Sequence, residues 1–249
     1  MNLVPFGRQL LETGDLDPIY TILWKAELHP NQLRRWLLAY WWFYHAGVSS
    51  HLSACKGNQF YREAAHLASK TATRRGTERR HFRGQKCLDC ISWFQRHYPA
   101  PESAVHSLER SWKISKLVKH LSASWPLFGP WMGFKVGDML ERLALAPVEF
   151  PAESLSMYST PVKGAKLACK LYDWDMSTEE VVTHLISVYH RYKAPPRYER
   201  PVNAQEIETI LCKWKSHKGG HYPLMKDTHE IKEGLIGYGA LATGLRRFL

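Results

Sequence analysis

Apolar positions along this chain recur mainly every three or four residues, which is the spacing of one face of an α-helix. The run NQLRRWLLAYWWFYHAGVSSHL, between Pro30 and Leu52, is apolar on nearly every side and predicts a central, buried helix. Pro30 suits the first turn of such a helix, because the missing N–H would have no partner there. No segment shows the convincing alternation of a half-buried strand. The sequence therefore predicts an all-α fold.

Further amphipathic segments place helices along the rest of the chain. The predicted ranges are 58–69, 85–97, 103–122, 134–145, 162–172, 178–192, 204–216 and 226–241. Prolines between residues 147 and 161 indicate an irregular connector. The stretch APPRYERP, residues 194–201, is the best candidate for a linker. We expect residues 1–249 to form a single two-lobed helical domain, with a possible linker near 194–201.

Composition indicates a class of partner through the net charge of the chain. The chain has a formal net charge of +11, which favours a polyanion, and its ten tryptophans and twelve tyrosines offer surfaces on which bases stack. Five cysteines is an odd number in a chain too long to depend on disulfides, so a reducing compartment is expected. No stretch resembles a signal peptide or a membrane span. The sequence predicts a soluble protein in the cytoplasm of the cell that makes it.

The segment from Lys70 to Lys86 is the densest concentration of positive charge. Arginine outnumbers lysine there, and arginine forms forked hydrogen bonds with phosphate oxygens. Glu78 is its single acid. A solvated charged loop is the alternative, but charges this dense repel one another unless an anion neutralises them. We interpret the segment as a phosphate-binding element without sequence specificity. The residues predicted to bind phosphate are Arg74, Arg75, Arg79, Arg80, Arg83 and Lys86.

The run LSASWPLFGPWMGFKVGDMLERL, residues 121–143, has the outline of two helices joined by a tight turn. In helix–hairpin–helix DNA glycosylases the turn reads Pro-Gly-hydrophobe-Gly, and its backbone N–H groups hold a phosphate. Pro126 and Gly129 match the outer positions, whereas Leu127 stands where the first glycine belongs. Gly129 is therefore a candidate phosphate contact. The departure at Leu127 puts the usual phosphate geometry in doubt.

Three residues that lie in the second helix of this hairpin outline, or shortly after it, are candidates for catalysis. Lys135 and Asp138 are three residues apart, so they share a helix face, either as a surface ion pair or as a functional pair facing a cleft. Glu149 stands twenty residues after Gly129, where such glycosylases carry a catalytic aspartate. A carboxylate after a helix is also common on any surface.

Other clusters suggest pockets rather than catalysis. The side chains from Trp41 to Tyr44 cannot all face one way, so most of them belong to the core. His45, followed by Ala-Gly, is either a core histidine or a group that a ligand can approach. The candidate pocket residues are Trp42, Tyr44, His45, Trp131 and Cys212.

The segment CKWKSHKGGHY, from Cys212 to Tyr222, predicts a second positive patch. Lys213 and Lys215 either bind an anion or compensate the dipole at the end of a helix. Cys212 is either an activated thiol or a buried one. Cys87 and Cys90 have the spacing of metal ligands, but no second pair completes a four-ligand site. We expect no dedicated metal site.

These stretches together resemble one family, the bacteriophage α-glutamyl/putrescinyl thymine pyrophosphorylases, which are also described as amino acid:DNA transferases. The resemblance spreads over nearly the whole chain, and RRHFRG and WMGFKxxD are its most specific parts. It is carried by residues 36–47, 75–84, 128–139, 212–215, 220–222 and 226–227.

The resemblance implies a helical, glycosylase-like fold that acts on phage DNA. In that pathway a kinase first forms 5-pyrophosphoryloxymethyl-deoxyuridine in DNA. The transferase then replaces pyrophosphate with a free amino acid, and the hypermodified base resists host restriction enzymes. The implied partners are double-stranded phage DNA and the amino acid, in the host cytoplasm. No redox cofactor is required, although a divalent metal is able to assist the leaving group.

The resemblance also suggests roles for the candidate residues. Arg79, Arg80 and Arg83 would hold the leaving pyrophosphate, with help from Lys135 or Lys215. The other cations of the segment would follow the DNA backbone. The attacking amine must be neutral, so a base is needed, for which Asp138 and Glu149 are candidates. The target base would leave the stack and lie against an aromatic ring such as Trp131.

Two rival functions remain open at this stage. A helix–hairpin–helix DNA glycosylase or lyase would use Lys135 as a Schiff-base amine. A DNA-binding protein without enzymatic activity would use its arginines only to hold phosphates and its aromatic residues only as core. The sequence does not identify the amino acid, the preferred DNA sequence or the oligomeric state.

Overall fold

The computed structural model describes all residues from Met1 to Leu249 and confirms the all-α prediction. Fourteen α-helices account for nearly all regular structure, together with short 3₁₀ turns and two strands of two residues each. No helix is both long enough and apolar enough to cross a membrane. In chain order the helices are α1 (Leu3–Thr13), α2 (Pro18–Lys25), α3 (Pro30–Phe43), α4 (Ala46–Ala54), α5 (Gly57–Ser69), α6 (Gln85–His97), α7 (Pro101–His106), α8 (Ile114–Ser124), α9 (Pro130–Arg142), α10 (Ser159–Tyr172), α11 (Thr178–Val188), α12 (Ala204–Lys218), α13 (Lys226–Gly234) and α14 (Gly239–Leu245).

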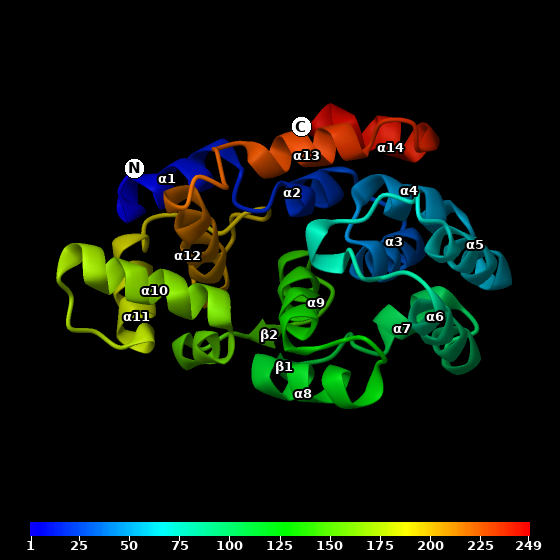
Figure 1. Cartoon of the computed structure of the whole chain (residues 1–249), viewed down its shortest axis with the longest axis horizontal. Coiled ribbons are helices and arrows are strands. Elements are labelled where there is room, and N and C mark those ends of the chain that lie inside the picture. The colour runs from blue at the N-terminus through cyan, green and yellow to red at the C-terminus, as the bar shows by residue number, and fades with distance from the viewer.

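The helices form two lobes that the chain visits more than once (Figure 1). One lobe holds α1 and α10 to α12, and the other holds α3 to α7. The chain begins in the first lobe, crosses to the second, returns through α8 and α9, and crosses again with α13 and α14. A single cluster of 66 buried apolar residues runs through both lobes. The space between the lobes is therefore framed by segments from distant parts of the sequence.

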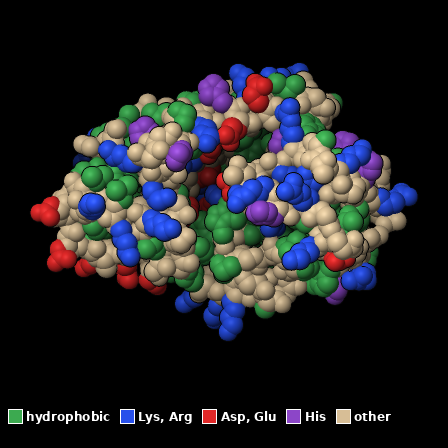
Figure 2. Space-filling view, in the orientation of Figure 1, with side chains coloured by type: hydrophobic (Ala, Val, Ile, Leu, Met, Phe, Trp, Pro, Cys, Tyr) green, Lys and Arg blue, Asp and Glu red, His purple; other side chains and the backbone are tan.

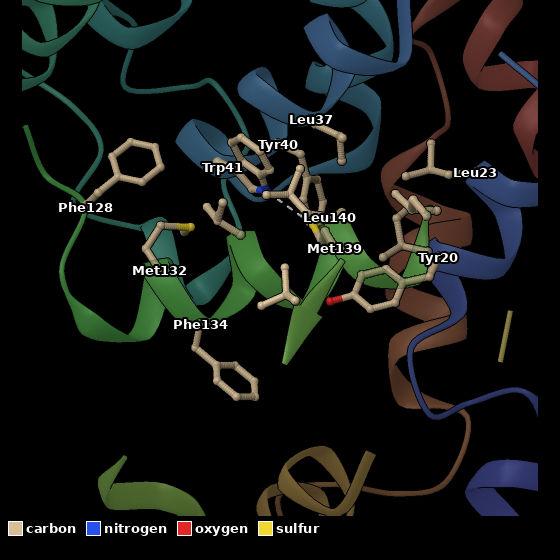
Figure 3. Packing of buried hydrophobic residues seen from close by; sticks show 14 of the residues in the cluster. Tyr20, Leu23, Leu37, Tyr40, Trp41, Phe128, Met132, Phe134, Met139 and Leu140 are labelled. Atoms are coloured by element: carbon tan, nitrogen blue, oxygen red, sulfur yellow. Dashed lines mark hydrogen bonds between the residues drawn. The ribbon is translucent and has the colours of Figure 1, made fainter. Parts of the chain in front are cut away.

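Helix α9 lies centrally and is buried along almost its whole length. All residues from Met132 to Leu140 are buried. Figure 3 shows its apolar side chains packed against α3 on one side and α2 on the other. The indole N–H of Trp41 points at the Met139 sulfur at 3.3 Å, and the hydroxyl of Tyr20 points toward α9. This packing fixes the direction of every polar side chain that α9 carries.

The helix predicted between Pro30 and Leu52 is wrong as one element, because it breaks into α3 and α4. Tyr44 adopts a left-handed conformation with φ of 48°, which ends α3. The His45 imidazole then caps α4 by accepting the Val48 N–H at 3.3 Å. The backbone N–H of Gly76 donates to the Phe43 carbonyl at 3.0 Å, so the arginine-rich segment covers this break.

Other predicted boundaries changed for local reasons. The predicted helix 103–122 is two helices, α7 and α8, separated by an irregular segment and the strand β1 (Trp112–Lys113). The predicted helix 226–241 is interrupted where Gly237 and Gly239 have positive φ values. Helices α1 and α2 were not predicted at all. The strand β2 (Val148–Glu149) pairs in parallel with β1. Strands of two residues are too short to produce a recognisable pattern in the sequence.

The segment 194–201 is packed rather than free. Ala194, Pro195 and Pro196 are buried. The Pro195 carbonyl accepts a hydrogen bond from the Arg142 guanidinium at 2.8 Å, and Arg200 binds Glu141 at 2.8 Å. The segment predicted as a possible linker therefore joins α9 to the start of α12.

Candidate active site

The polar side chains of α9 converge on a buried cluster between the lobes. The Lys135 ammonium donates to the Tyr20 hydroxyl at 3.2 Å and lies 3.3 Å from carboxylate oxygens of both Asp17 and Asp138. The Tyr20 hydroxyl in turn donates to Asp138 at 2.6 Å. Lys135 is 8% exposed and Asp138 is fully buried. The structure thus brings the sequence-predicted Lys135 and Asp138 together in an environment where charge interactions are strong.

A second layer of contacts holds this cluster in place. Arg142, one turn after Asp138, donates to Asp17 at 2.7 Å. From α12, the Gln205 amide donates to Asp138 at 3.3 Å, and the Thr209 hydroxyl donates to Asp17 at 3.3 Å. The cluster therefore ties the α1–α2 turn, α9 and α12 together. A rigid arrangement of this kind is what a catalytic site requires.

Burial and charge shift the pKa values of the cluster in opposite directions. Burial opposes ionisation of Asp17, but Lys135 and Arg142 outweigh it and lower the Asp17 pKa. Burial also disfavours the Lys135 cation, yet the neighbouring anions raise its pKa well above the ordinary value. For Asp138 burial prevails over the nearby cations and raises the pKa. Lys135 is therefore a fixed positive charge, while Asp138 holds its proton more tightly than an ordinary aspartate.

Two further side chains, Glu78 and Tyr44, reach solvent although protein surrounds much of each of them. Burial raises the pKa of both side chains, and the positive charge of Lys135 partly opposes that increase. Figure 2 shows the molecule hollowed between its lobes, with acidic side chains inside and Lys and Arg side chains on both lobes beside the hollow. We call this hollow the central cleft.

The sequence did not reveal Asp17 and Glu208, two acids that interact with Lys135. Asp17 precedes α2 in a stretch for which no helix was predicted. Glu208 lies on α12 and is 6% exposed, and burial raises its pKa. Glu208 had a detectable signal, because it is four residues before Cys212 and the two share a face of the predicted helix 204–216.

The arginine-rich segment divides into structural and exposed residues. Arg75 donates to backbone carbonyls of Phe82 at 2.6 Å and Thr73 at 2.5 Å, and it also reaches the last turn of α5. Arg79 donates to the Trp41 carbonyl at 2.7 Å and the Leu127 carbonyl at 2.9 Å. Their guanidinium groups are committed to holding this loop, so neither is placed to grip phosphate as the sequence suggested.

Arg74, Arg80, Arg83 and Lys86 are exposed, in contrast. Arg80 makes a single hydrogen bond, to the Thr77 carbonyl of its own loop at 3.2 Å. These four side chains are free to bind an anion. The structure leaves them as the phosphate-binding candidates of the segment.

The turn between α8 and α9 presents the N-terminus of α9 to solvent. Leu127 has φ of 65°, so the turn keeps a left-handed backbone although a leucine stands there. Gly129 is the exposed N-cap of α9 and has no neighbour within 4 Å of the position a Cβ would take. Trp131 is 36% exposed and lies edge-on to Tyr44, with the ring centroids 5.4 Å apart. Tyr44 and Trp131 therefore form an aromatic pair at the start of α9.

Two other pocket candidates have structural roles. Trp42 is fully buried among aromatic rings, with Phe94 at 5.3 Å and Phe82 stacked at 6.1 Å, so it cannot contact a substrate base. His45 caps α4, and burial together with Arg74 lowers its pKa to about 4. His45 is therefore neutral at physiological pH and packs against Tyr238.

The second positive patch is divided in the same way. Lys213 is buried and pairs with Asp227 at 2.7 Å, so it anchors α13 to α12 rather than binding an anion. Lys215 is partly exposed, and its positive charge acts on Cys212 by lowering the pKa of the thiol slightly against the larger opposing effects. Burial and Glu208 raise the pKa of the Cys212 thiol well above its ordinary value. Cys212 is thus a protonated hydrogen-bond donor and not an activated thiol.

Glu149 is exposed on the short strand β2, paired in register with Lys113 of β1. It takes no part in the buried cluster. Cys87 and Cys90 are buried free thiols on α6. No three His, Cys, Asp or Glu side chains are grouped to hold a metal ion.

Comparisons with known proteins identify the family of this chain. The family model described as amino acid:DNA transferase matches residues 9–222, which include Asp17, the whole of α9 and Glu208. The chain belongs to the amino acid:DNA transferase family. A glycinyltransferase of Pseudomonas phage PaMx11 is 37% identical, with the whole chain and 94% of that protein aligned. A putrescinyltransferase of Delftia phage PhiW-14 is 28% identical, with 97% of the chain and 80% of that protein aligned.

Family membership confirms the resemblance seen in the sequence. The transferase acts in phage DNA hypermodification by attaching an amino acid to DNA, within the host cell. Of the candidate catalytic residues, Lys135 and Asp138 lie in the buried cluster within the matched region, whereas Glu149 lies apart on the surface.

Proposed function

We propose that this transferase replaces the pyrophosphate of 5-pyrophosphoryloxymethyl-deoxyuridine in double-stranded DNA with a free amino acid, in the host cytoplasm. The observation that carries the proposal is the buried Lys135 ammonium, held by Asp17, Tyr20 and Asp138 beside a cleft that cationic side chains border. A cation fixed before the reaction begins stabilises a departing polyanion without reorganising. The modified base would protect phage DNA from host restriction enzymes.

DNA binding would use the exposed cations at the edge of the central cleft. Arg74 and Lys86 would follow the backbone, and the free N-terminus of α9 at Gly129 would accept one phosphate. The target nucleotide must leave the duplex, because its methylene carbon is otherwise inaccessible. The aromatic pair Tyr44–Trp131 offers a surface on which the extruded base would stack.

The substitution would then proceed at the methylene carbon of the extruded base. The bond from this carbon to the pyrophosphate oxygen breaks, and its electron pair leaves with pyrophosphate, whose charge Lys135, Arg80 and Arg83 neutralise. The amine nitrogen of the amino acid donates its lone pair to form the new bond to carbon. The nearby uracil ring stabilises positive charge on the methylene carbon as the leaving group departs.

We further propose glycine as the first amino acid to test. The reason is the 37% identity to a protein named glycinyltransferase over the whole chain, against 28% to one named putrescinyltransferase. Both names describe primary amines as the transferred group, so a primary amine is the shared chemistry.

The lyase alternative receives less support from the site. A Schiff-base lysine must be neutral, which requires a lowered pKa. The anions around Lys135 raise its pKa instead. A fixed cation suits charge neutralisation and not amine nucleophilicity.

The test is to incubate the protein with pyrophosphorylated hydroxymethyl-uracil duplex and each of the common amino acids or putrescine, then digest the DNA to nucleosides for mass spectrometry. The proposal expects a mass shift that corresponds to one amine, glycine first. A Lys135→Met sample serves as the inactive control. Absence of a mass shift with every amine would reject the proposed reaction, and a borohydride-trapped protein–DNA adduct would support the lyase instead.

A further inference from the structure

Glu208 differs from the other buried carboxylates of this protein. Asp138 and Glu206 lie near cations, and Asp15 accepts hydrogen bonds from the Tyr222 hydroxyl, the Met225 N–H and Thr228. Glu208 has no cationic side chain within 4 Å. Its hydrogen-bond partners are the Cys212 thiol at 3.0 Å, which is a weak donor, and the Thr209 hydroxyl at 3.4 Å, which Glu208 shares with Asp17. An ionised carboxylate buried without a cation is unfavourable, and a group of this kind is a candidate for contact with a ligand.

A buried polar group without a hydrogen-bond partner interacts with the charge of Glu208. The Tyr158 hydroxyl is buried and has no hydrogen-bond partner, and the residue is 6% exposed. Its ring packs edge-on against Phe134 of α9, with centroids 4.8 Å apart, which fixes its direction. Burial raises the pKa of Tyr158, and Glu208 is the charge that raises it further. Two polar groups from different elements, α12 and the turn before α10, thus lie close enough to interact through their charges.

The ligand that these groups fit is a primary amine. An ammonium offers three N–H donors and a positive charge, which matches a carboxylate without a cation and a hydroxyl without a hydrogen-bond partner. Lys135 lies near enough to lower the Glu208 pKa, so this region adjoins the cluster assigned to the departing pyrophosphate. An anion would be repelled by Glu208, and an apolar group would leave both polar groups unsatisfied.

We propose that Glu208, Tyr158 and Cys212 form the seat of the attacking amine, and that Glu208 is the base that deprotonates it. The inference rests on the proposed transfer reaction and extends it to a catalytic residue. The ammonium gives one proton to the Glu208 carboxylate, and the neutral amine then attacks the methylene carbon. The carbon–nitrogen bond forms, the carbon–oxygen bond breaks, and the product leaves as a secondary ammonium. The proton on Glu208 passes to the released pyrophosphate or to water.

The kinetic test measures transfer to pyrophosphorylated duplex against glycine concentration from pH 6.5 to 9.5. The variants are Glu208→Gln and Tyr158→Phe, with Glu153→Gln as the matched control because Glu153 is an exposed acid near Tyr158. For Glu208→Gln we expect kcat/KM for glycine to fall by about 10²-fold or more at pH 7. The loss should shrink toward pH 9.5, where solution supplies neutral amine. Tyr158→Phe should raise KM several-fold, and Glu153→Gln should change nothing.

An equilibrium measurement separates this proposal from the transfer reaction itself. Calorimetry with glycine and unmodified duplex should show binding to wild type and at least tenfold weaker binding to Glu208→Gln. Binding that depends on Glu208 in a protein without transfer activity would reject the reaction and keep the amine seat. Unchanged kcat/KM and unchanged glycine affinity in Glu208→Gln would overturn the seat, as would a loss of equal size at every pH. Putrescine replaces glycine as the probe if wild type binds no glycine, and failure of both amines also overturns it.

Discussion

Arg79 and Arg80 are neighbours of the same type with opposite roles, and this contrast gives the sharpest stability prediction. Arg79 donates two charged hydrogen bonds to backbone carbonyls from distant parts of the chain, at Trp41 and Leu127. Its guanidinium also lies over the rings of Phe82 and Phe128, at 5.6 and 5.2 Å from their centroids. Burial lowers its pKa to about 10, so the group remains charged at neutral pH.

The cost of Arg79→Ala follows from these contacts. A hydrogen bond to a charged group contributes about 1.5–3 kcal/mol, and a cation–ring contact contributes about 0.5–1 kcal/mol where solvent reaches it. We take the lower ends because the Leu127 carbonyl contact is exposed. The free energy of unfolding should therefore fall by about 4 kcal/mol, which corresponds to a Tm decrease of roughly 8–16 °C for a chain of this size.

Arg80→Ala is the matched control in the same loop. Its side chain is exposed and reaches only its own loop, so the unfolding free energy should change by less than about 0.5 kcal/mol. The transfer rate should fall while DNA affinity is kept, because Arg80 is proposed to hold pyrophosphate. Urea unfolding followed by tryptophan fluorescence measures the first effect. Equal destabilisation by the two variants would refute the assignment of Arg79 as a structural residue and of Arg80 as an exposed anion-binding residue.

Four further predictions follow from the site and its supports. Lys135→Met should abolish transfer and reduce the unfolding free energy in urea by about 3 kcal/mol, the lower end for a broken buried ion pair, because Asp17 and Asp138 lose Lys135 but keep Arg142; full activity would exclude Lys135 from the reaction. Glu208→Gln should raise the Tm at pH 8, because burial raises the Glu208 pKa and a group with a raised folded pKa loses stability as pH rises through it; a lower Tm would mean that the carboxylate is structural. His45 has a pKa lowered to about 4, so stability should fall as pH drops from about 6.5 toward 4, and a His45→Asn cap should flatten that dependence in pH-resolved urea titrations; an unchanged slope would contradict the capping role. Gly47→Ala should loosen α13 and α14 in limited proteolysis, because a Cβ there meets the Gly234 carbonyl and the Tyr238 ring; unchanged cleavage would show that these helices dock independently of α4.

The fold class and most helices could be predicted because apolar spacing is a local property. Helices 58–69 and 85–97 match α5 and α6 almost residue for residue. The break at Tyr44 could not be predicted, because it depends on a hydrogen bond from Gly76 to the Phe43 carbonyl, and these two residues are 33 positions apart in the sequence. Such a contact leaves no periodic signal in either segment.

The candidate site was predicted only in part, because the sequence shows local spacing but not tertiary packing. Lys135 and Asp138 share a helix face, so their spacing alone suggested a pair. Asp17, Tyr20 and Glu208 join them only through tertiary packing of α2 and α12 against α9. The density of charge in the sequence also could not distinguish the structural role of Arg79 from the exposed position of Arg80. The difference arises because the fold brings the Trp41 and Leu127 carbonyl groups to Arg79 alone.

The central claim is that an amine displaces pyrophosphate from DNA in the central cleft. The most direct measurement counts both products in one reaction: pyrophosphate released and modified nucleoside formed, with pyrophosphorylated duplex, glycine and wild-type protein. The account predicts one pyrophosphate per modified nucleoside, with neither product above background in Lys135→Met. Modified nucleoside formed without pyrophosphate, or pyrophosphate released at the same rate without any amine, would contradict it.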